Sequence, residues 1–241
     1  MASEKDGYAY FTSRAKEVRA LEDENWRLGF ESRHRDLNLS TLSKHIVESL
    51  CNLSPLEKND LVVDIGAGGG GLAKLLEDIY KKRECLYLMV DSEEILKLGF
   101  KSVIKPIYGS FPKNSNEVKT WLDSNGKRAK HLISNSVLHY VRYDNQLVEF
   151  IKSVIELLDE GGTAFLGDVP STNSKKAQAY VSNKAFEESA HNFSYEDFAE
   201  IANTASNLGC STFITPQPRI FPMSPHRVDL LIFKHKEVPT W

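Results

Sequence analysis

A dense run of glycines is the first sign of a ligand site in this chain. Five of the six positions from 66 to 71 are glycine, directly after the largely apolar run 61–65 and before a helix-forming stretch. Glycine has no Cβ, so it accepts positive φ and lets a ligand approach the backbone, while free N–H groups at a helix start attract polar or anionic atoms. A purely structural turn needs only one or two glycines. We therefore predict a strand, a turn and a helix whose turn holds a cofactor.

The same glycines fit a dinucleotide-binding spacing. Gly66, Gly68 and Gly71 match G-x-G-x-x-G, and Asp91 lies 20 residues beyond Gly71, after the apolar run 85–90. A carboxylate at that place is suited to accept hydrogen bonds from the two hydroxyls of a ribose. The spacing alone leaves the identity of the cofactor open.

Further polar side chains follow the other expected strands. Ligands gather beyond the carboxyl ends of the strands in an open parallel sheet, so these positions are candidate site residues. They are Asp64, Asp91, Ser110, Asn135, Ser136, His139 and Asp168. The final strand should run opposite to its neighbours, so its beginning, near His226 and Arg227, belongs to the same edge. The connection 216–226 is expected to overhang that edge.

The elements that must position these residues alternate along the chain. Strand-like runs at 61–65, 85–90, 103–108, 131–134 and 163–167 are separated by helical stretches, which predicts a parallel sheet with helices on both faces. Two later runs, 210–215 and 228–234, predict an antiparallel hairpin. We expect an α/β fold: a Rossmann-like, doubly wound, seven-stranded sheet, mostly parallel with an antiparallel C-terminal hairpin strand, plus an N-terminal helical cap.

The first part of the chain is expected to be helical. Helices are predicted around 13–23 and 40–53, the second halted by Ser54-Pro55. We predict that residues 1–55 form a cap or lid and that residues 56–241 form the main domain, together one structural unit. Aromatic residues between 8 and 26 could exclude water from the site, and ordinary packing of the cap on the sheet is the equal alternative.

Composition restricts the class of protein. The 241 residues carry a net charge of −3 and have no long basic tract, which disfavours nucleic acid as a partner. The three cysteines are odd in number and far apart, which predicts no disulfide framework, no clustered metal site and a reducing, cytoplasmic setting. No apolar run approaches the length of a membrane span, and the polar N-terminus does not resemble a signal peptide.

Three features in combination resemble the class I S-adenosylmethionine-dependent methyltransferases. A helical segment precedes the first strand, Leu157-Leu158-Asp159-Glu160-Gly161-Gly162 leads into the fifth, and a hairpin closes the sheet. The resemblance covers about Leu61 to the C-terminus. It implies the fold, S-adenosyl-L-methionine as cofactor and S-adenosyl-L-homocysteine as product. In that family Asp64 and the turn Gly66-Ala67-Gly68 would lie along the methionine part, and Asp91 would bind both ribose hydroxyls.

The resemblance extends to two further segments. Gly109-Ser110-Phe111 follows the third strand, where the family commonly has a small residue and an acid near the adenine; serine replaces that acid here, and a plain turn is the alternative. Residues 134–140 match a segment whose backbone faces the cofactor and whose side chains approach the acceptor. The predicted cofactor-binding residues are Asp64, Gly66, Ala67, Gly68, Gly70, Asp91, Ser92, Gly109, Ser110, Phe111, Asn135 and Ser136.

Methyl transfer from a sulfonium is an in-line displacement, so much of the catalysis can come from positioning. An alcohol acceptor also needs a base, and His139 is the first candidate because imidazole titrates near neutral pH. The competing interpretation is that His139 packs beside Tyr140 or only orients the substrate. Asp168 is the alternative base, and it could equally cap the following turn.

Charged residues point to an acceptor that could be anionic. Arg33, Arg35, His226 and Arg227 could converge on a phosphate or carboxylate, although exposed arginines are usually solvated or paired with nearby acids. The predicted substrate-binding residues are Arg33, Arg35, His139, Tyr140, His226 and Arg227. The expected partner is a small molecule, and the chain is expected to be a monomer or homodimer.

A looser resemblance links the chain to methyltransferases of bacterial surface-polysaccharide and lipopolysaccharide pathways. It is carried by the segments 167–170, 193–197, 216–218 and 226–231. It implies a sugar, sugar phosphate or phosphoramidate-type acceptor, methylated on oxygen rather than nitrogen. The alternatives are an NAD(P)-dependent oxidoreductase and a non-catalytic regulatory protein that binds the cofactor.

Overall fold

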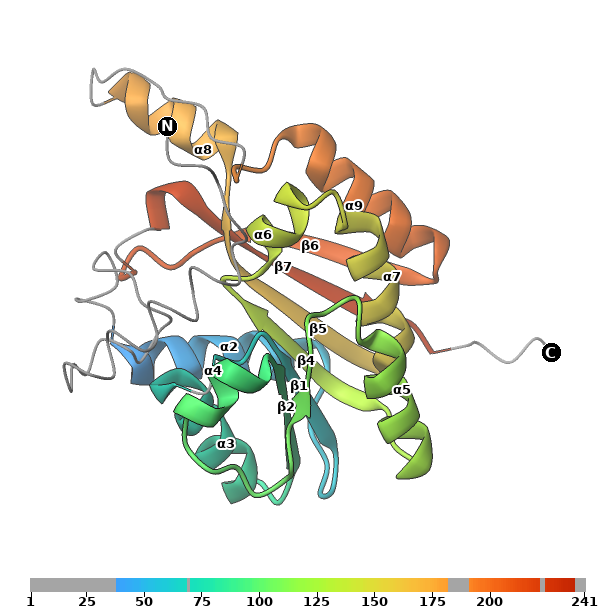
Figure 1. The fold of residues 1–241 in the computed structure, drawn as a ribbon. Coiled ribbons are helices and arrows are strands. Elements are labelled where there is room, and N and C mark those ends of the chain that lie inside the picture. Colours follow the sequence, from blue (N-terminus) through green and yellow to red (C-terminus); the bar gives the residue numbers. More distant parts are fainter. Residues whose placement is uncertain (1–37, 69, 182–190, 222–223, 237–241) are drawn as a thin grey trace.

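The described residues form one sheet with helices on both faces (Figure 1). A computed structural model describes residues 38–68, 70–181, 191–221 and 224–236. The predicted helix at 13–23, the aromatic residues of the expected lid, Arg33 and Arg35 lie outside this part of the chain.

The sheet has seven strands in the order β3-β2-β1-β4-β5-β7-β6. Their bounds are β1 Leu61–Ile65, β2 Leu86–Asp91, β3 Ile107–Tyr108, β4 Ala129–Asn135, β5 Leu158–Pro170, β6 Cys210–Pro216 and β7 Arg227–Lys234. Strands β1 to β5 pair in parallel, whereas β7 runs antiparallel to both β5 and β6. The predicted fold class, including the antiparallel hairpin strand, is confirmed.

The third strand is shorter than the predicted run 103–108. Val103 is 73% exposed, and its N–H donates to the carboxylate of Glu77 at 3.0 Å. The hydroxyl of Ser102 donates to the same oxygen at 2.5 Å. Glu77 on the neighbouring helix therefore holds this segment as a loop, and only Ile107–Tyr108 reaches β2.

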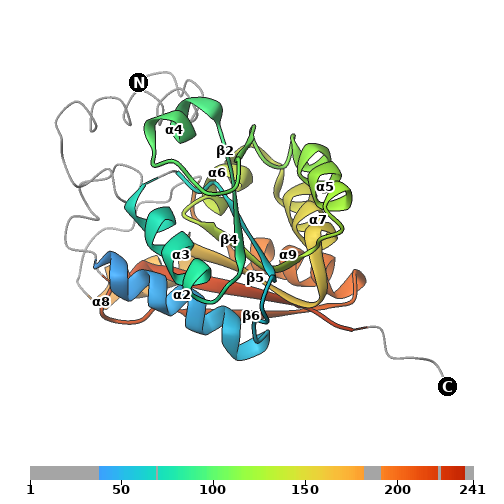
Figure 2. The same cartoon turned by 90° about the horizontal axis from the view of Figure 1, so that it is seen from below.

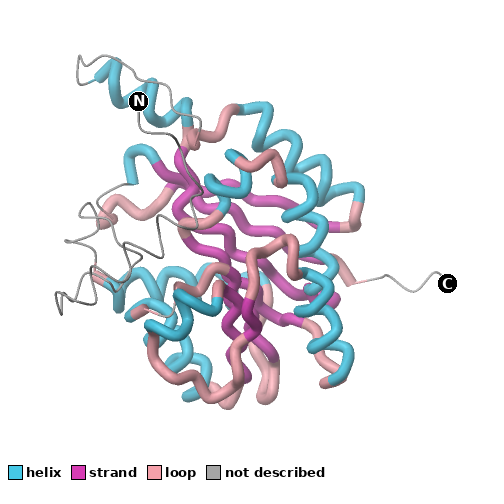
Figure 3. Tube along the Cα trace, viewed as in Figure 1, coloured by secondary structure: helices cyan, strands magenta, loops and turns pink. Residues whose placement is uncertain are grey.

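Helices occupy two layers, one on each face of the sheet (Figure 2). Their bounds are α2 Leu39–Leu53, α3 Gly71–Lys82, α4 Glu93–Leu98, α5 Ser115–Ser124, α6 Leu138–Tyr143, α7 Leu147–Leu157, α8 Thr172–Val181 and α9 Tyr195–Asn207, with a 3-10 turn, η3, at Ser224–His226. Helices α2 and α3 cover one face, and α5, α7 and α9 cover the other, with the strands between them (Figure 3). None of these helices has the length and apolar character needed to cross a bilayer.

Helix α2 confirms the helix predicted at 40–53 and belongs to the layer on the sheet. Its apolar residues recur at helical spacing, so Leu42, Ile46 and Leu50 form one stripe. That stripe packs in one core cluster with Phe165 of β5 and Leu231 of β7. The start of α2 is capped by Asn38, whose side chain accepts the N–H of Thr41. The division of the chain at residue 55 stays a prediction.

Candidate active site

The glycine turn follows β1 directly and has the predicted backbone geometry. Gly66 and Gly68 have φ values of +70° and +69°, and the N–H of Gly66 donates to the carbonyl of Val90 at 2.8 Å. A Cβ on Gly66 would overlap the side chain of Val137, whereas a Cβ on Gly68 would have no atom within 4 Å. Packing therefore requires glycine at position 66, and the turn borders open space at position 68.

The structure brings Asp91 against this turn. The N–H of Gly68 donates to Oδ2 of Asp91 at 2.8 Å, and the N–H of Ser92 donates to Oδ1 at 2.6 Å. Burial raises the pKa of the Asp91 carboxyl, and the two N–H donors oppose that shift. The side chain of Ser92 caps α4, because its hydroxyl accepts the N–H of Ile95.

Asp64 lies beneath the turn on β1, and its carboxylate accepts the hydroxyl proton of Tyr87. Burial raises the pKa of Asp64 to about 7; the bond from Tyr87 opposes the shift and the charge of Asp91 adds to it. Tyr87 was not among the predicted residues, because its position inside an apolar strand gave no sign of a polar partner.

The end of β3 holds an amide without a partner. The N–H of Gly109 donates to the carbonyl of Asp91 at 2.9 Å, and a Cβ on Gly109 would overlap the side chain of Asn114. Neither polar atom of the buried Asn114 amide has a hydrogen-bond partner among the described residues. Of the predicted residues here, Ser110 is exposed, whereas the ring of Phe111 packs edge-on against Phe150 at 5.2 Å.

The ends of β4 and β5 place three predicted residues together. The N–H of Ser136 donates to the carbonyl of Gly167 at 3.0 Å, and its hydroxyl donates to Oδ2 of Asp168 at 2.6 Å. The Asn135 amide donates to the Ser136 hydroxyl at 3.3 Å. Both Ser136 and Asp168 have φ near +60°, an uncommon conformation for residues other than glycine.

Arg227 is directed inward. It is 5% exposed, Nη1 donates to the carbonyl of Asp168 at 2.9 Å, and Nε lies 3.5 Å from the Asp168 carboxylate. Its neighbour His226 is half-buried, and burial followed by the charges of Lys175 and Arg227 lowers the pKa of that imidazole. Lys175 on α8 therefore lies near enough to His226 for its charge to act on the imidazole.

His139 lies at the start of α6 in a group of rings. Its centroid is 4.0 Å from that of Tyr140 and 6.0 Å from that of His191, and Nδ1 of His191 is 3.5 Å from the carbonyl of His139. His191 was not predicted, because no strand end marks its position in the sequence. The roles of His139 as base and of Tyr140 as substrate contact stay predictions.

Sequence reasoning also missed a histidine and a carboxylate that meet across the fold. Nε2 of His45 on α2 lies 2.8 Å from Oδ2 of Asp229 on β7. Neither residue was among the predicted site residues. A single acid within the apolar run 228–233 was the available signal.

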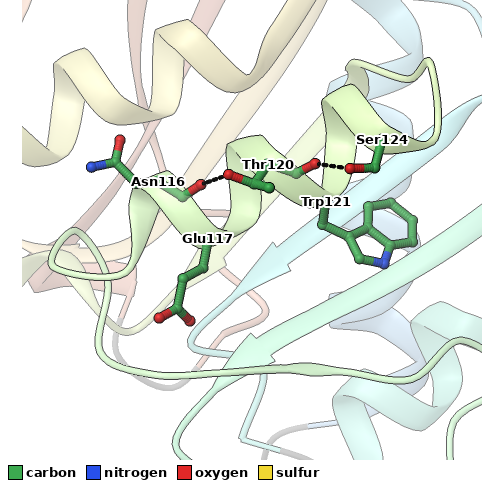
Figure 4. Close-up of a pocket in the computed structure, with 5 residues that line it drawn as sticks. All are labelled: Asn116, Glu117, Thr120, Trp121 and Ser124. Carbon is green, nitrogen blue, oxygen red and sulfur yellow. Dashed lines mark hydrogen bonds between the residues drawn. The ribbon is translucent and has the colours of Figure 1, made fainter.

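A surface hollow on α5 lies apart from these strand ends (Figure 4). It is lined by Asn116, Glu117, Thr120, Trp121 and Ser124. The hydroxyls of Thr120 and Ser124 donate to backbone carbonyls one turn earlier, at 2.8 and 2.7 Å, and are therefore satisfied within the helix (Figure 4). No residue of the predicted site lines this hollow.

No protein-family model and no curated protein matches the sequence. Among solved structures, human N-acetylserotonin methyltransferase in complex with SAM has a TM-score of 0.56 and 15% identity, over 95% of this chain and 58% of that one. The plantazolicin methyltransferase BpumL in complex with SAH has a TM-score of 0.52 and 12% identity, over 94% and 100%.

A pericyclic reaction enzyme has a TM-score of 0.52 and 13% identity, over 97% of this chain and 56% of that one. The chain thus spans a little over half the length of two of these neighbours. At these identities the likeness shows the fold, which is the Rossmann-like fold of methyltransferases.

Proposed function

We propose that this chain transfers the methyl group of S-adenosylmethionine to a small-molecule acceptor, on oxygen rather than nitrogen. The observation that carries the proposal is the contact between Gly68 and Asp91, which holds a carboxylate beside the open side of a glycine turn. The solved neighbours with SAM and SAH bound support the same cofactor.

The residues present fit this cofactor. Each oxygen of the Asp91 carboxylate already accepts one N–H and has a second lone pair left, so the pair can receive two ribose hydroxyls. The unpartnered amide of Asn114 offers a donor and an acceptor beside Gly109, where a purine edge needs both. The backbone of Gly66, Ala67, Gly68 and Gly70 and the carboxyl of Asp64 remain for the methionine part.

The sheet favours this cofactor over a nicotinamide dinucleotide. The dinucleotide-binding fold has the order 3-2-1-4-5-6. In this chain an antiparallel strand, β7, separates β5 from β6. The glycine spacing fits both cofactors, and the inserted strand is the feature that separates them.

The acceptor belongs over the ends of β4 and β5, since the cofactor occupies the ends of β1 and β2. When bound, the cofactor supplies an electrophilic methyl on a sulfonium. Ser136 and Asp168 are bonded to each other at the proposed acceptor side and can orient a hydroxyl by hydrogen bonds. His139 and Asp168 are the base candidates taken from the sequence.

The finer proposal is a sugar, sugar phosphate or phosphoramidate-type acceptor of surface-polysaccharide biosynthesis. The ammonium of Lys175 at the edge of the site would favour an anionic group, and the neutral imidazole of His226 can donate a hydrogen bond to it. Three free cysteines support a cytoplasmic setting. A monomer or homodimer is expected.

Calorimetric titration of the purified chain with S-adenosylmethionine and S-adenosylhomocysteine tests the proposal. Asp91→Ala should weaken the affinity for both compounds by about 10- to 100-fold, because hydrogen bonds to a charged group contribute about 1.5–3 kcal/mol. Asp123→Ala, at an exposed carboxylate on α5, is the matched control and should leave both affinities unchanged.

Two outcomes would contradict the proposal. The first is a wild type that binds neither compound, or that binds NADH or NADPH more tightly. The second is tight binding with no S-adenosylhomocysteine formed across sugars, sugar phosphates, carboxylates and amines. That result would favour a regulatory role, or chemistry other than methyl transfer on this fold.

A further inference from the structure

The contact between His45 and Asp229 joins α2 to the strand that closes the sheet. The two residues are 184 positions apart, and Nε2 of His45 lies 2.8 Å from Oδ2 of Asp229. Asp229 is 1% exposed, whereas the side chain of His45 is 21% exposed. The pair therefore has one buried member and one partly exposed member.

The surroundings of Asp229 fix the proton on the imidazole. Its Oδ1 accepts the N–H of Asp168 and the side-chain amide of Gln217, each at 3.0 Å, which leaves Oδ2 for His45. A carboxylate can only accept, so Nε2 of His45 donates to it. Nδ1 of the neutral ring is then a lone-pair acceptor, and it has no hydrogen-bond partner among the described residues.

Aromatic rings hold the imidazole in place. Phe165 of β5 and Phe221 of the connection after β6 contact His45 edge-on, with centroids at 5.8 and 5.4 Å. Both rings are uncharged, and among the described residues Asp229 is the charged partner of His45. The two apolar rings and the hydrogen bond to Asp229 together keep the imidazole of His45 in one orientation, as a base requires.

Hydrogen bonds connect this pair to the proposed acceptor side. Asp229 accepts the N–H of Asp168, and the Asp168 carboxylate accepts the hydroxyl of Ser136. Figure 1 shows the start of α2 and the connection that carries Phe221 on the same side of the molecule. His45 therefore stands next to the carboxyl end of β5.

We propose that His45, held by Asp229, is the base that takes the proton of the acceptor during methyl transfer. This role rests on the methyl transfer proposed above. As the acceptor oxygen attacks the methyl carbon, the new O–C bond forms and the S–C bond breaks, with its electron pair staying on sulfur. The hydroxyl proton passes to Nδ1 of His45, and the imidazolium charge is stabilised by Asp229.

His45 suits this role better than His139. His139 is buried at 5% exposure and lies against the ring of Tyr140. His45 is more exposed, and a carboxylate orients its ring, which is the arrangement of a base with a positioning partner.

The experiment is an NMR titration of the histidine rings in the wild-type chain, saturated first with S-adenosylmethionine and then with S-adenosylhomocysteine. The two complexes differ at the sulfur by one methyl and one positive charge. A charge close to an imidazole disfavours its protonation, so the titration midpoint of His45 should be about one pH unit or more lower with S-adenosylmethionine. Single His45→Gln and His139→Gln variants assign the signals, and backbone-correlated spectra of the wild type assign them if a variant does not fold.

His131 is the internal control, because Nε2 of this buried ring is bonded to the carbonyl of Ser54 at the other end of the sheet. Its midpoint should be the same in both complexes. A His45 midpoint that does not move, or that moves less than that of His139, would overturn the assignment of the base. Failure of the wild type to bind either compound would instead overturn the proposed function, so the two failures are distinguishable.

Discussion

The hydroxyl of Tyr87 on β2 donates to the buried carboxylate of Asp64 on β1, directly beneath the glycine turn. Burial raises the pKa of Asp64 from its ordinary value of 3.8 to about 7. Between these two pH values the carboxyl is protonated in the folded chain and ionised in the unfolded chain. This carboxyl therefore lowers the free energy of unfolding as pH rises from about 4 to about 7.

Asp64→Asn should remove that dependence, since asparagine keeps an acceptor for Tyr87 and does not titrate. The variant should gain stability relative to the wild type between pH 5 and pH 8, by about 1–3 kcal/mol. Urea denaturation at both pH values measures the difference. If the unfolding free energies of Asp64→Asn and the wild type differ by the same amount at pH 5 and at pH 8, Asp64 is ionised in the folded chain.

His131 should have the opposite effect. Burial lowers the pKa of this imidazole to about 4, so it stays neutral in the folded chain while the unfolded chain takes up a proton below about 6.5. The free energy of unfolding is therefore unaffected by His131 above pH 6.5 and falls by up to about 3 kcal/mol as the pH falls towards 4.

His131→Gln can keep a donor for the Ser54 carbonyl without titrating, so the variant should lose less stability than the wild type between pH 7 and pH 4.5. His235→Gln, at an exposed ring, is the matched control and should follow the wild type. Denaturation curves at the two pH values provide the comparison. A wild-type profile for His131→Gln would contradict the buried neutral imidazole.

Gly66 and Gly68 should respond differently to alanine. Both have positive φ, which costs an alanine about 1–2 kcal/mol, but only at position 66 would the new methyl also overlap Val137. Gly66→Ala should therefore be the more destabilising change in thermal denaturation. Adding Val137→Ala to Gly66→Ala should recover the steric part. At Gly68 the methyl enters open space, so the main loss should be in affinity for S-adenosylmethionine.

Arg227 should be important for stability. Its guanidinium is buried against Asp168, and removing one partner of a buried pair costs about 3–5 kcal/mol. Arg227→Met should lower the unfolding free energy by that order, and Lys175→Met on α8 by much less. If Arg227→Met unfolds like the wild type in urea, the bonds to Asp168 carry little of the stability.

Local order along the chain could be predicted because it depends on neighbours in sequence. In the run 61–71, apolar residues specify the strand and glycines specify the turn that leads into the helix. Asp91 is positioned by β2, because it is the last residue of that strand. The third strand was predicted too long, since the carboxylate that holds Val103 in a loop comes from another element, α3.

The sequence by itself determined the parallel sheet, its antiparallel closing strand and the edge at which candidate polar residues collect, because hydrophobic periodicity and turn chemistry act over a few residues. Only the tertiary structure decided which side chains meet there. Ser136 reaches Asp168, Arg227 turns inward and His45 finds Asp229 across 184 positions. Those contacts depend on strand order and register, which bring distant residues together and which no local pattern specifies.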